Sequence, residues 1–285
     1  MLLNSYFCFP FVIKSLYSGI LYEKGYVHLL NQIHTCYEHP LGPRKLPEKR
    51  VGDRVYGVVV PYSSYVVSGP CAAWSYKLLA EHYFPETYVL LVPDTSGTFV
   101  NYVTVTDDFE TPFGICYIDR AFAQALLDTG IVSRARDVQE FALEVQLPFL
   151  QHACRDKVKQ LQILPLIVPH THNVDRVAQE LVKIKKDIVV IVASHLSLQN
   201  SSSLSEEELS AQDLAIVQYI LDFDVEGLEH FVRKNKGTLP GIYALILGLH
   251  ILKQLGVQQG ELLHHYRSSL LISGQGSEGF ASMVF

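Results

Sequence analysis

The chain has 285 residues, of which 48% are hydrophobic and 18% charged, and its formal net charge is −6. An acidic balance without a dense basic patch argues against a nucleic-acid partner. No apolar stretch reaches the roughly 18–20 residues that a membrane-spanning helix requires, so no membrane partner is predicted.

The first 17 residues, MLLNSYFCFPFVIKSLY, are apolar and aromatic but do not fit a signal peptide. They lack a basic n-region, and they include Pro10 and Lys14. We therefore expect residues 1–17 to form an N-terminal arm or strand that packs on the rest of the chain. The cysteines are scattered without a CxxC pair, which predicts free thiols and a cytoplasmic location. They are Cys8, Cys36, Cys71, Cys116 and Cys154.

Short apolar runs rich in β-branched residues predict strands that are buried on both faces. They lie at 55–60, 88–92, 161–168 and 188–193. Helical stretches alternate with these runs, at 69–82, 174–185 and 205–221. The last one opens with Ser205 followed by three glutamates, a typical helix start. This alternation predicts an α/β fold with a largely parallel sheet and helices on both faces.

Two segments depart from the parallel pattern and predict a mixed sheet. Residues 99–106 and 114–118 flank the turn-rich stretch DDFETPF and are expected to form a β-hairpin. Residues 264–285 alternate loosely around ISGQGSEG and are expected to form two further strands. Without a long linker or an internal repeat, we expect one domain over residues 1–285.

The first strand ends in a mouth that is rich in serine and tyrosine, PYSSYVVSGP at 61–70. Ser68-Gly69-Pro70 opens the next helix, and we expect its backbone N–H groups to face this mouth. Such a helix end can hold a carboxylate or phosphate without a metal ion. The pattern therefore favours an anionic small molecule as a ligand.

Several longer motifs occur in the order seen in the Memo family, also called AmmeMemoRadiSam system protein B. The chain resembles that family from about Ser18 to its end. The motifs are HPLGPRKLP (39–47), VVVPYSSYVVSGPCAA (58–73), LLVPDTSG (90–97), TPFG (111–114), EFALEVQLPFLQ (140–151), ASHLS (193–197) and GFASMVF (279–285). The resemblance implies a fold like that of LigB-type class III extradiol dioxygenases, with a central mixed sheet flanked by helices.

The resemblance also implies a metal site whose ligands this chain has replaced. The family's PHAGY is PYSSY at 61–65, so the position of the first histidine is Tyr62. The position of the second histidine is Thr95, in VPDT at 92–95. The family's cysteine motif aligns loosely with the segment that begins at Gly237, and no cysteine follows Cys154.

These replacements predict that the chain holds no metal cofactor. A transition-metal ion needs about three or more suitable protein donors held together in space. A phenol with a reference pKa near ~10 is a poor ligand unless the metal itself ionises it. A threonine hydroxyl is weaker still, and glycine offers no side chain.

A rebuilt metal site is the alternative that the sequence leaves open. Asp94, Glu140, Glu144 and His195 are all expected near the same cleft, and Asp, Glu and His can together bind a divalent ion. Such a site would support a dioxygenase- or oxidoreductase-like enzyme. In the simpler interpretation, Asp94 caps the turn after its strand and His195 has a structural role.

The leading hypothesis is a pseudoenzyme: a Memo-like frame that has lost its metal centre and serves as a binding or scaffolding protein. Its residual cleft would keep the polar residues Tyr65, Asp94, Glu140, Glu144 and His195. The bulky side chains of Tyr62, Phe141 and Leu198 would pack into the cavity that the metal site occupies in other members of the family. The family name also suggests a radical SAM protein or an AMMECR-type protein as a partner.

Overall fold

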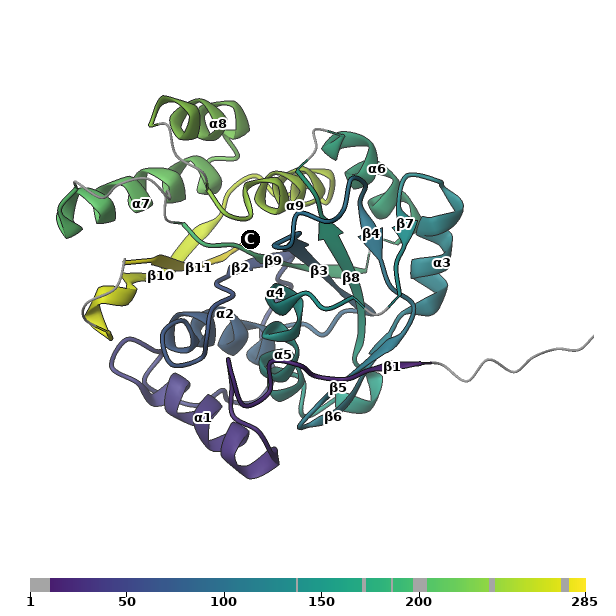
Figure 1. The fold of residues 1–285 in the computed structure, drawn as a ribbon, viewed down its shortest axis with the longest axis horizontal. Coiled ribbons are helices and arrows are strands. Elements are labelled where there is room, and N and C mark those ends of the chain that lie inside the picture. Colours follow the sequence, from purple (N-terminus) through teal and green to yellow (C-terminus); the bar gives the residue numbers. More distant parts are fainter. Residues whose placement is uncertain are drawn as a thin grey trace, which may run out of the picture.

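The structure is a computed structural model, and it describes residues 11–136, 138–170, 173–185, 187–196, 204–235, 239–272 and 277–285. In these ranges eleven strands form a mixed sheet with helices on both faces, as Figure 1 shows. The predicted fold class is therefore confirmed. Within the same ranges, no helix combines the length and the apolar character needed to cross a bilayer.

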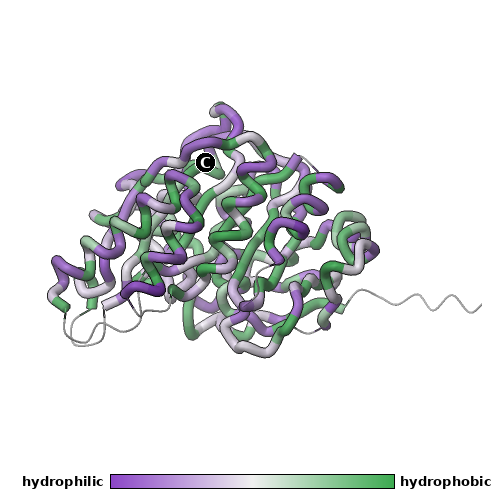
Figure 2. The backbone as a smooth tube through the Cα atoms, turned by 90° about the horizontal axis from the view of Figure 1, so that it is seen from above, coloured by the Kyte–Doolittle hydropathy of each residue, from purple (hydrophilic) through white to green (hydrophobic). Residues whose placement is uncertain are grey.

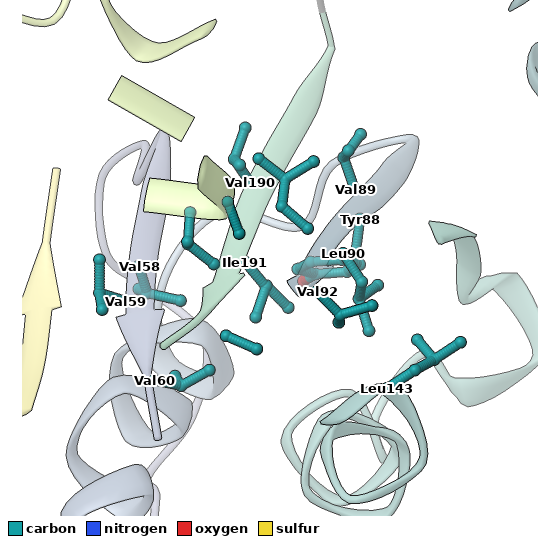
Figure 3. Packing of buried hydrophobic residues seen from close by; sticks show 14 of the residues in the cluster. Val58, Val59, Val60, Tyr88, Val89, Leu90, Val92, Leu143, Val190 and Ile191 are labelled. Atoms are coloured by element: carbon teal, nitrogen blue, oxygen red, sulfur yellow. The ribbon is translucent and has the colours of Figure 1, made fainter. Parts of the chain in front are cut away.

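Parallel strands make up the centre of the sheet, in the order β6-β8-β3-β9-β2. The side chains of β2, β3, β8 and β9 are almost all buried, since helices cover both faces and the runs are rich in valine, leucine and isoleucine. Figure 3 shows how side chains of β2, β3 and β9 pack together. The strands are β6 (Gly114–Ile118), β8 (Gln162–Val168), β3 (Thr87–Pro93), β9 (Ile188–Ala193) and β2 (Gly57–Val60).

Antiparallel strands extend the sheet on both sides. At one side β11 (Gly279–Val284) pairs with β2, and β10 (Glu261–Arg267) pairs with β11, which confirms the two strands expected near the C-terminus. At the other side β5 (Asp108–Thr111) pairs with β6, and β1 (Val12–Ile13) runs parallel to β5. The short β4 (Val103–Thr104) lies antiparallel to β8, and β7 (Ser133–Arg134) lies beside β4.

The predicted hairpin had the wrong first strand. The segment DDFETPF, expected to be a turn, supplies β5 itself, while 99–106 contributes only the two residues of β4. The polar β5 is stable as a strand because Asp108 accepts hydrogen bonds from the Ile118 amide and from Arg120. The turn is only Pro112 and Phe113, because Thr111 pairs directly with Gly114.

Helices cover the two faces of the sheet in separate groups (Figure 1). One face carries α1 (Tyr26–Glu38), α2 (Gly69–Glu81), α4 (Phe141–Glu144) and α5 (Gln146–Ala153). The other carries α3 (Arg120–Asp128), α6 (Val174–Ile184), α9 (Ile242–Gln254), α7 (Glu206–Leu221) and α8 (Val225–Lys234). Short 3₁₀ turns occupy Val158–Gln160 and Ser268–Leu270. Helices α2, α6 and α7 match their predicted positions closely.

Hydropathy explains this layering. Figure 2 shows hydrophobic backbone concentrated in the interior, while many helices alternate between hydrophilic and hydrophobic residues. Helix α9 is an exception, since most of its residues are buried against β3 and β9. Helix α7 begins with a capping box, in which Ser205 and Glu208 bond each other's backbone N–H groups. The cysteines of the described ranges are buried free thiols.

Candidate functional site at the carboxyl edge of the sheet

The carboxyl ends of β2, β3 and β9 bring the predicted site residues to one edge of the sheet. Val60 pairs with Ala193, so Tyr62 and His195 each lie two residues beyond a matched pair. Strand β3 lies on the other side of β9 and ends at Pro93, immediately before Asp94 and Thr95. In open α/β sheets, ligands bind beyond the carboxyl ends of the strands, so this edge is the candidate site.

Tyr62 and His195 form an aromatic stack at the centre of the site. Their ring centroids lie 3.9 Å apart with an interplanar angle of 21°. Phe141 lies 5.8 Å from the Tyr62 ring, and Phe280 lies 5.6 Å from the His195 ring. Only 4% of Tyr62 and 9% of His195 is exposed, so these rings fill the edge rather than line an open metal site.

Burial changes the proton affinity of both stacked groups. It raises the pKa of the Tyr62 phenol, and the carboxylates of Glu140 and Glu278 add to the shift. It lowers the pKa of His195 to about 4, because the buried imidazolium cannot be solvated. The Nε2 atom of His195 is buried and has no hydrogen-bond partner in the described structure. At neutral pH both rings are therefore uncharged.

Thr95 and Glu140 are joined by two hydrogen bonds. The Thr95 hydroxyl donates to Glu140 Oε1 at 2.6 Å, and its backbone N–H donates to Oε2 at 3.0 Å. Glu140 is also the N-cap of α4, where it accepts from the Ala142 N–H. Burial nevertheless raises the pKa of Glu140, since desolvation outweighs these hydrogen bonds. Both carboxylate oxygens are thus engaged within the chain.

Asp94 caps the turn after β3, as the simpler interpretation expected. Its Oδ1 accepts from the Ser96 hydroxyl at 2.7 Å, and its Oδ2 accepts from the Phe99 N–H at 2.7 Å. Both bonds are local, which is typical of an aspartate that shapes a loop. This carboxylate is 4% exposed.

Glu144 and the backbone of Tyr65, whose N–H donates to the Leu21 carbonyl at 2.9 Å, hold the N-terminal segment. Glu144 accepts from the backbone N–H groups of Leu16 and Tyr17, each at 2.9 Å, and from the Tyr22 hydroxyl at 2.7 Å. The Tyr65 hydroxyl donates to the Val145 carbonyl at 2.6 Å. Residues 11–17 of the expected arm therefore pack on the chain, and residues 1–10 lie outside the described ranges.

The rebuilt metal site is not formed. Asp94 is bonded to its own loop, Glu140 to Thr95 and Glu144 to the N-terminal segment, while His195 is stacked on Tyr62. Across the described ranges no three His, Cys, Asp or Glu side chains form a group that could hold a metal ion. The four side chains bond elsewhere because shared proximity to one edge does not fix the direction in which each side chain points.

The positions of the implied family ligands also do not fit a transition metal. The Tyr62 phenol has a raised pKa, and the Thr95 hydroxyl donates to a carboxylate. Gly237 and Leu198 lie outside the described residues. The chain next to Gly237 does reach this edge, because the Pro240 carbonyl accepts from Ser194 Oγ at 3.2 Å. Gly241, at φ +87°, passes so close to the end of β9 that a Cβ atom there would lie 3.0 Å from Ser194 Oγ and 3.2 Å from the Ala193 carbonyl oxygen.

The helix end expected to hold an anion is already occupied. The Ser68 and Gly69 N–H groups donate to the carbonyls of Ser64 and Tyr65, at 2.9 and 3.2 Å. A turn therefore precedes α2 and takes up its first amide donors, and Pro70 has none. The N–H groups of Ser68 and Gly69 are therefore not available to a ligand at this position.

Glu278 is a member of the site that sequence reasoning missed. Its charge contributes to the raised pKa of Tyr62, and burial raises its own pKa. It reaches the site because the Leu196 N–H donates to the Gly279 carbonyl, which ties the end of β9 to the start of β11. The sequence offered no signal for this, since Glu278 stands alone in a loop rich in glycine and serine.

Comparison with known proteins identifies the family to which the chain belongs. The profile of the Memo-like protein family matches residues 14–284. The chain belongs to the Memo-like family. It is 30% identical to a MEMO1 family protein of Methanopyrus kandleri, over 94% of this chain and 96% of that protein. A MEMO1 family protein of Methanococcus maripaludis is 29% identical, over 94% and 97% of the two chains.

A further MEMO1 family protein, from Methanococcus vannielii, is 31% identical over 88% of this chain and 91% of that protein. The Memo-like match begins near the segment that Glu144 holds and extends to the last strand. The match thus covers the residues of the Tyr62–His195 stack, and the family resemblance predicted from the motifs is confirmed.

Proposed function

We propose that this chain is a non-catalytic Memo-like protein that acts by binding or scaffolding. Its frame presents the edge where the family resemblance implies metal chemistry, but the side chains there serve packing and internal hydrogen bonding.

The observation that carries the proposal is the engagement of the site's own side chains. The Tyr62 ring is stacked on His195, and the Thr95 hydroxyl is bonded to Glu140. A metal ion would have to break the hydrogen bonds between the exposed Thr95 and the buried Glu140 carboxylate, and to ionise a phenol whose pKa is already raised. Losing a buried hydrogen-bond partner costs about 1–3 kcal/mol for each group left unsatisfied. The existing arrangement therefore competes directly with metal coordination.

Metal loading tests this proposal. Purified protein is incubated separately with Fe(II), Cu(II) and Zn(II), freed of excess metal and analysed by elemental mass spectrometry. We expect far less than one ion per chain. The matched variant carries Tyr62→His and Thr95→His, which supplies two imidazole donors and should retain more metal than the native chain. Stoichiometric metal in the native chain that is lost in the Glu140→Gln variant would overturn the proposal.

Partner proteins follow from the same proposal. We propose a radical SAM protein or an AMMECR-type protein as the first candidates, with an anionic small molecule or peptide as a further ligand class. Co-expression with tagged candidate partners, followed by size-exclusion chromatography, provides the measurement. A stable complex that survives Tyr62→Phe and forms without added metal supports scaffolding. Substrate turnover by the purified chain would instead establish an enzyme.

A further inference from the structure

A buried ion pair lies beside the start of β11, where α7 packs on β10 and β11 (Figure 1). Arg267, the last residue of β10, donates to Asp213 of α7, and only 5% and 2% of the two side chains is exposed. The Nε2 atom of His265 lies 3.2 Å from the same Asp213 oxygen. Desolvation offsets much of the attraction in a buried pair, but breaking it leaves an uncompensated charge. The pair therefore favours one arrangement of the elements around it.

This pair fixes the chain at the start of β11. Arg267 faces Gly279 in the strand ladder, and its Nη2 donates to the Ser277 carbonyl at 2.5 Å. A Cβ atom at position 279 would lie 2.1 Å from Asp213 Oδ2, so glycine leaves the room that this carboxylate occupies. Residues 277–279 are thus held by a side chain of β10 and packed against a side chain of α7.

The same junction supports the Tyr62–His195 stack. The Gly279 carbonyl accepts from the Leu196 N–H at 3.2 Å, immediately after His195. Phe280 follows Gly279, and its ring lies 5.6 Å from that of His195. The His195 ring and the backbone next to it are thus held by β11, and the start of β11 is held by the buried ion pair.

The network of the ion pair ends at the surface, on the first turn of α7. Glu206, the first residue of α7, accepts from Arg267 Nε at 3.3 Å. The hydroxyls of Ser269 and Ser277 donate to the same carboxylate at 2.8 and 2.9 Å. The Glu206 side chain is 52% exposed. A continuous set of contacts therefore connects an exposed carboxylate of α7 with the buried stack at the carboxyl edge of the sheet.

We propose that the Asp213–Arg267 pair is a coupling device, through which the first turn of α7 holds the start of β11 against His195. Contiguous hydrogen bonds and ion pairs of this kind can carry coupling between distant positions. Asp213 and Arg267 are positioning residues, since their influence on the stack passes through Gly279. The coupling does not depend on the proposed function, because it concerns how the stack is held and not what the site binds.

Two neighbouring substitutions on the first turn of α7 test this coupling. Glu206→Gln and Glu207→Gln each remove one negative charge from the same exposed turn, but of the two only Glu206 bonds Arg267 in the described structure. Nuclear magnetic resonance of the full chain measures the hydrogen exchange of the Leu196 amide and the ring signals of His195. We expect Glu206→Gln to speed this exchange about threefold and to shift the ring signals, because it weakens the hold on Arg267.

Glu207→Gln is the matched control and should leave both readouts at their native values. Unchanged readouts in the Glu206→Gln variant would overturn the coupling. Equal changes in both variants would also overturn it, since they would show a general effect of charge at the end of the helix.

Asp213→Asn tests the buried end of the device. It keeps the shape of the side chain but removes the charge next to Arg267, so the Leu196 amide should exchange about tenfold faster. Asp119→Asn removes another buried partner of a cation, Lys185, and serves as the control for a general loss of stability. Equal acceleration at Leu196 by both variants would contradict the coupling. If Asp213→Asn does not fold, the two substitutions on the first turn of α7 decide the question.

Discussion

At the residue scale, Tyr62 shows how a site can lose its chemistry and gain packing. The phenol ring stands where the family resemblance implies an imidazole, and it lies against both His195 and Phe141. Offset aromatic pairs contribute about 0.5–1.5 kcal/mol beyond the area they bury. The predicted filling of this space by Tyr62 and Phe141 agrees with these contacts.

We predict opposite outcomes for two substitutions of Tyr62. Tyr62→Ala should reduce the free energy of unfolding by about 3–5 kcal/mol, because it removes a buried ring and leaves a cavity. Tyr62→Phe keeps the ring and should change stability little. Chemical denaturation of both variants measures the difference, and a stable Tyr62→Ala variant would show that the ring does not support the fold.

His195 should make stability depend on pH. Because burial lowers its pKa to about 4, the unfolded chain takes up this proton at a higher pH than the folded chain. The free energy of unfolding should therefore fall as the pH drops from about 6.5 toward 4. His152, whose pKa burial lowers to about 3, acts in the same direction.

The variant His195→Phe isolates this contribution. It keeps a ring against Tyr62 but cannot bind a proton, so it should lose less stability between pH 7 and pH 5, by up to about 2 kcal/mol. Denaturant titrations at the two pH values provide the measurement. His230→Gln, at an exposed position, is the control and should follow the native chain. Identical pH profiles for native and His195→Phe protein would contradict the prediction.

At the scale of elements, the N-terminal segment depends on α4. Residues 14–22 have little regular structure of their own, and Glu144 provides three of their hydrogen bonds. Hydrogen bonds to a charged acceptor contribute about 1.5–3 kcal/mol each, more than neutral ones. Glu144 is therefore a main anchor of this segment, together with the Tyr65 N–H, which donates to the Leu21 carbonyl at 2.9 Å.

We predict that Glu144→Gln releases this segment locally. The amide side chain can accept with one oxygen only, so the backbone N–H groups of Leu16 and Tyr17 should exchange with deuterium at least tenfold faster. Hydrogen exchange followed by mass spectrometry measures this effect. Glu110→Gln removes a surface ion pair with Lys14 of the same segment and should have little effect. Equal exchange in both variants would show that Glu144 is not the anchor.

The elements also show where local patterns succeed. Strand β9 has the bounds that its apolar run predicts, because a strand buried on both faces must be apolar throughout. Strand β5 was missed, since its acidic residues are typical of a turn. Asp108 is satisfied by Ile118 and Arg120, and Glu110 pairs with Lys14. Its partners belong to another element, so the local pattern could not show them.

At the scale of the whole molecule, the main hydrophobic core runs from Ile13 to Phe285. It includes side chains from the central strands and from helices on both faces of the sheet (Figures 1 and 3). A continuous core of this kind favours cooperative unfolding, because no part can separate without exposing buried surface.

Calorimetry tests the prediction of one domain over residues 1–285. We expect a single unfolding transition in which the van't Hoff enthalpy equals the calorimetric enthalpy. Two resolved transitions, or a calorimetric enthalpy well above the van't Hoff value, would show independent units. Destabilising Tyr62→Ala should shift the whole transition rather than part of it.

The sequence by itself determined the sheet's central strands, the family frame and the types of side chain at the metal positions. These properties are local, because burial fixes the hydrophobic period and each residue fixes its own donor chemistry. Only the tertiary structure decided that Glu144 bonds Leu16, 128 residues away, that Glu278 reaches Tyr62, and that the first amides of α2 are occupied. Such pairings depend on how distant elements pack, and many packings satisfy the same local pattern.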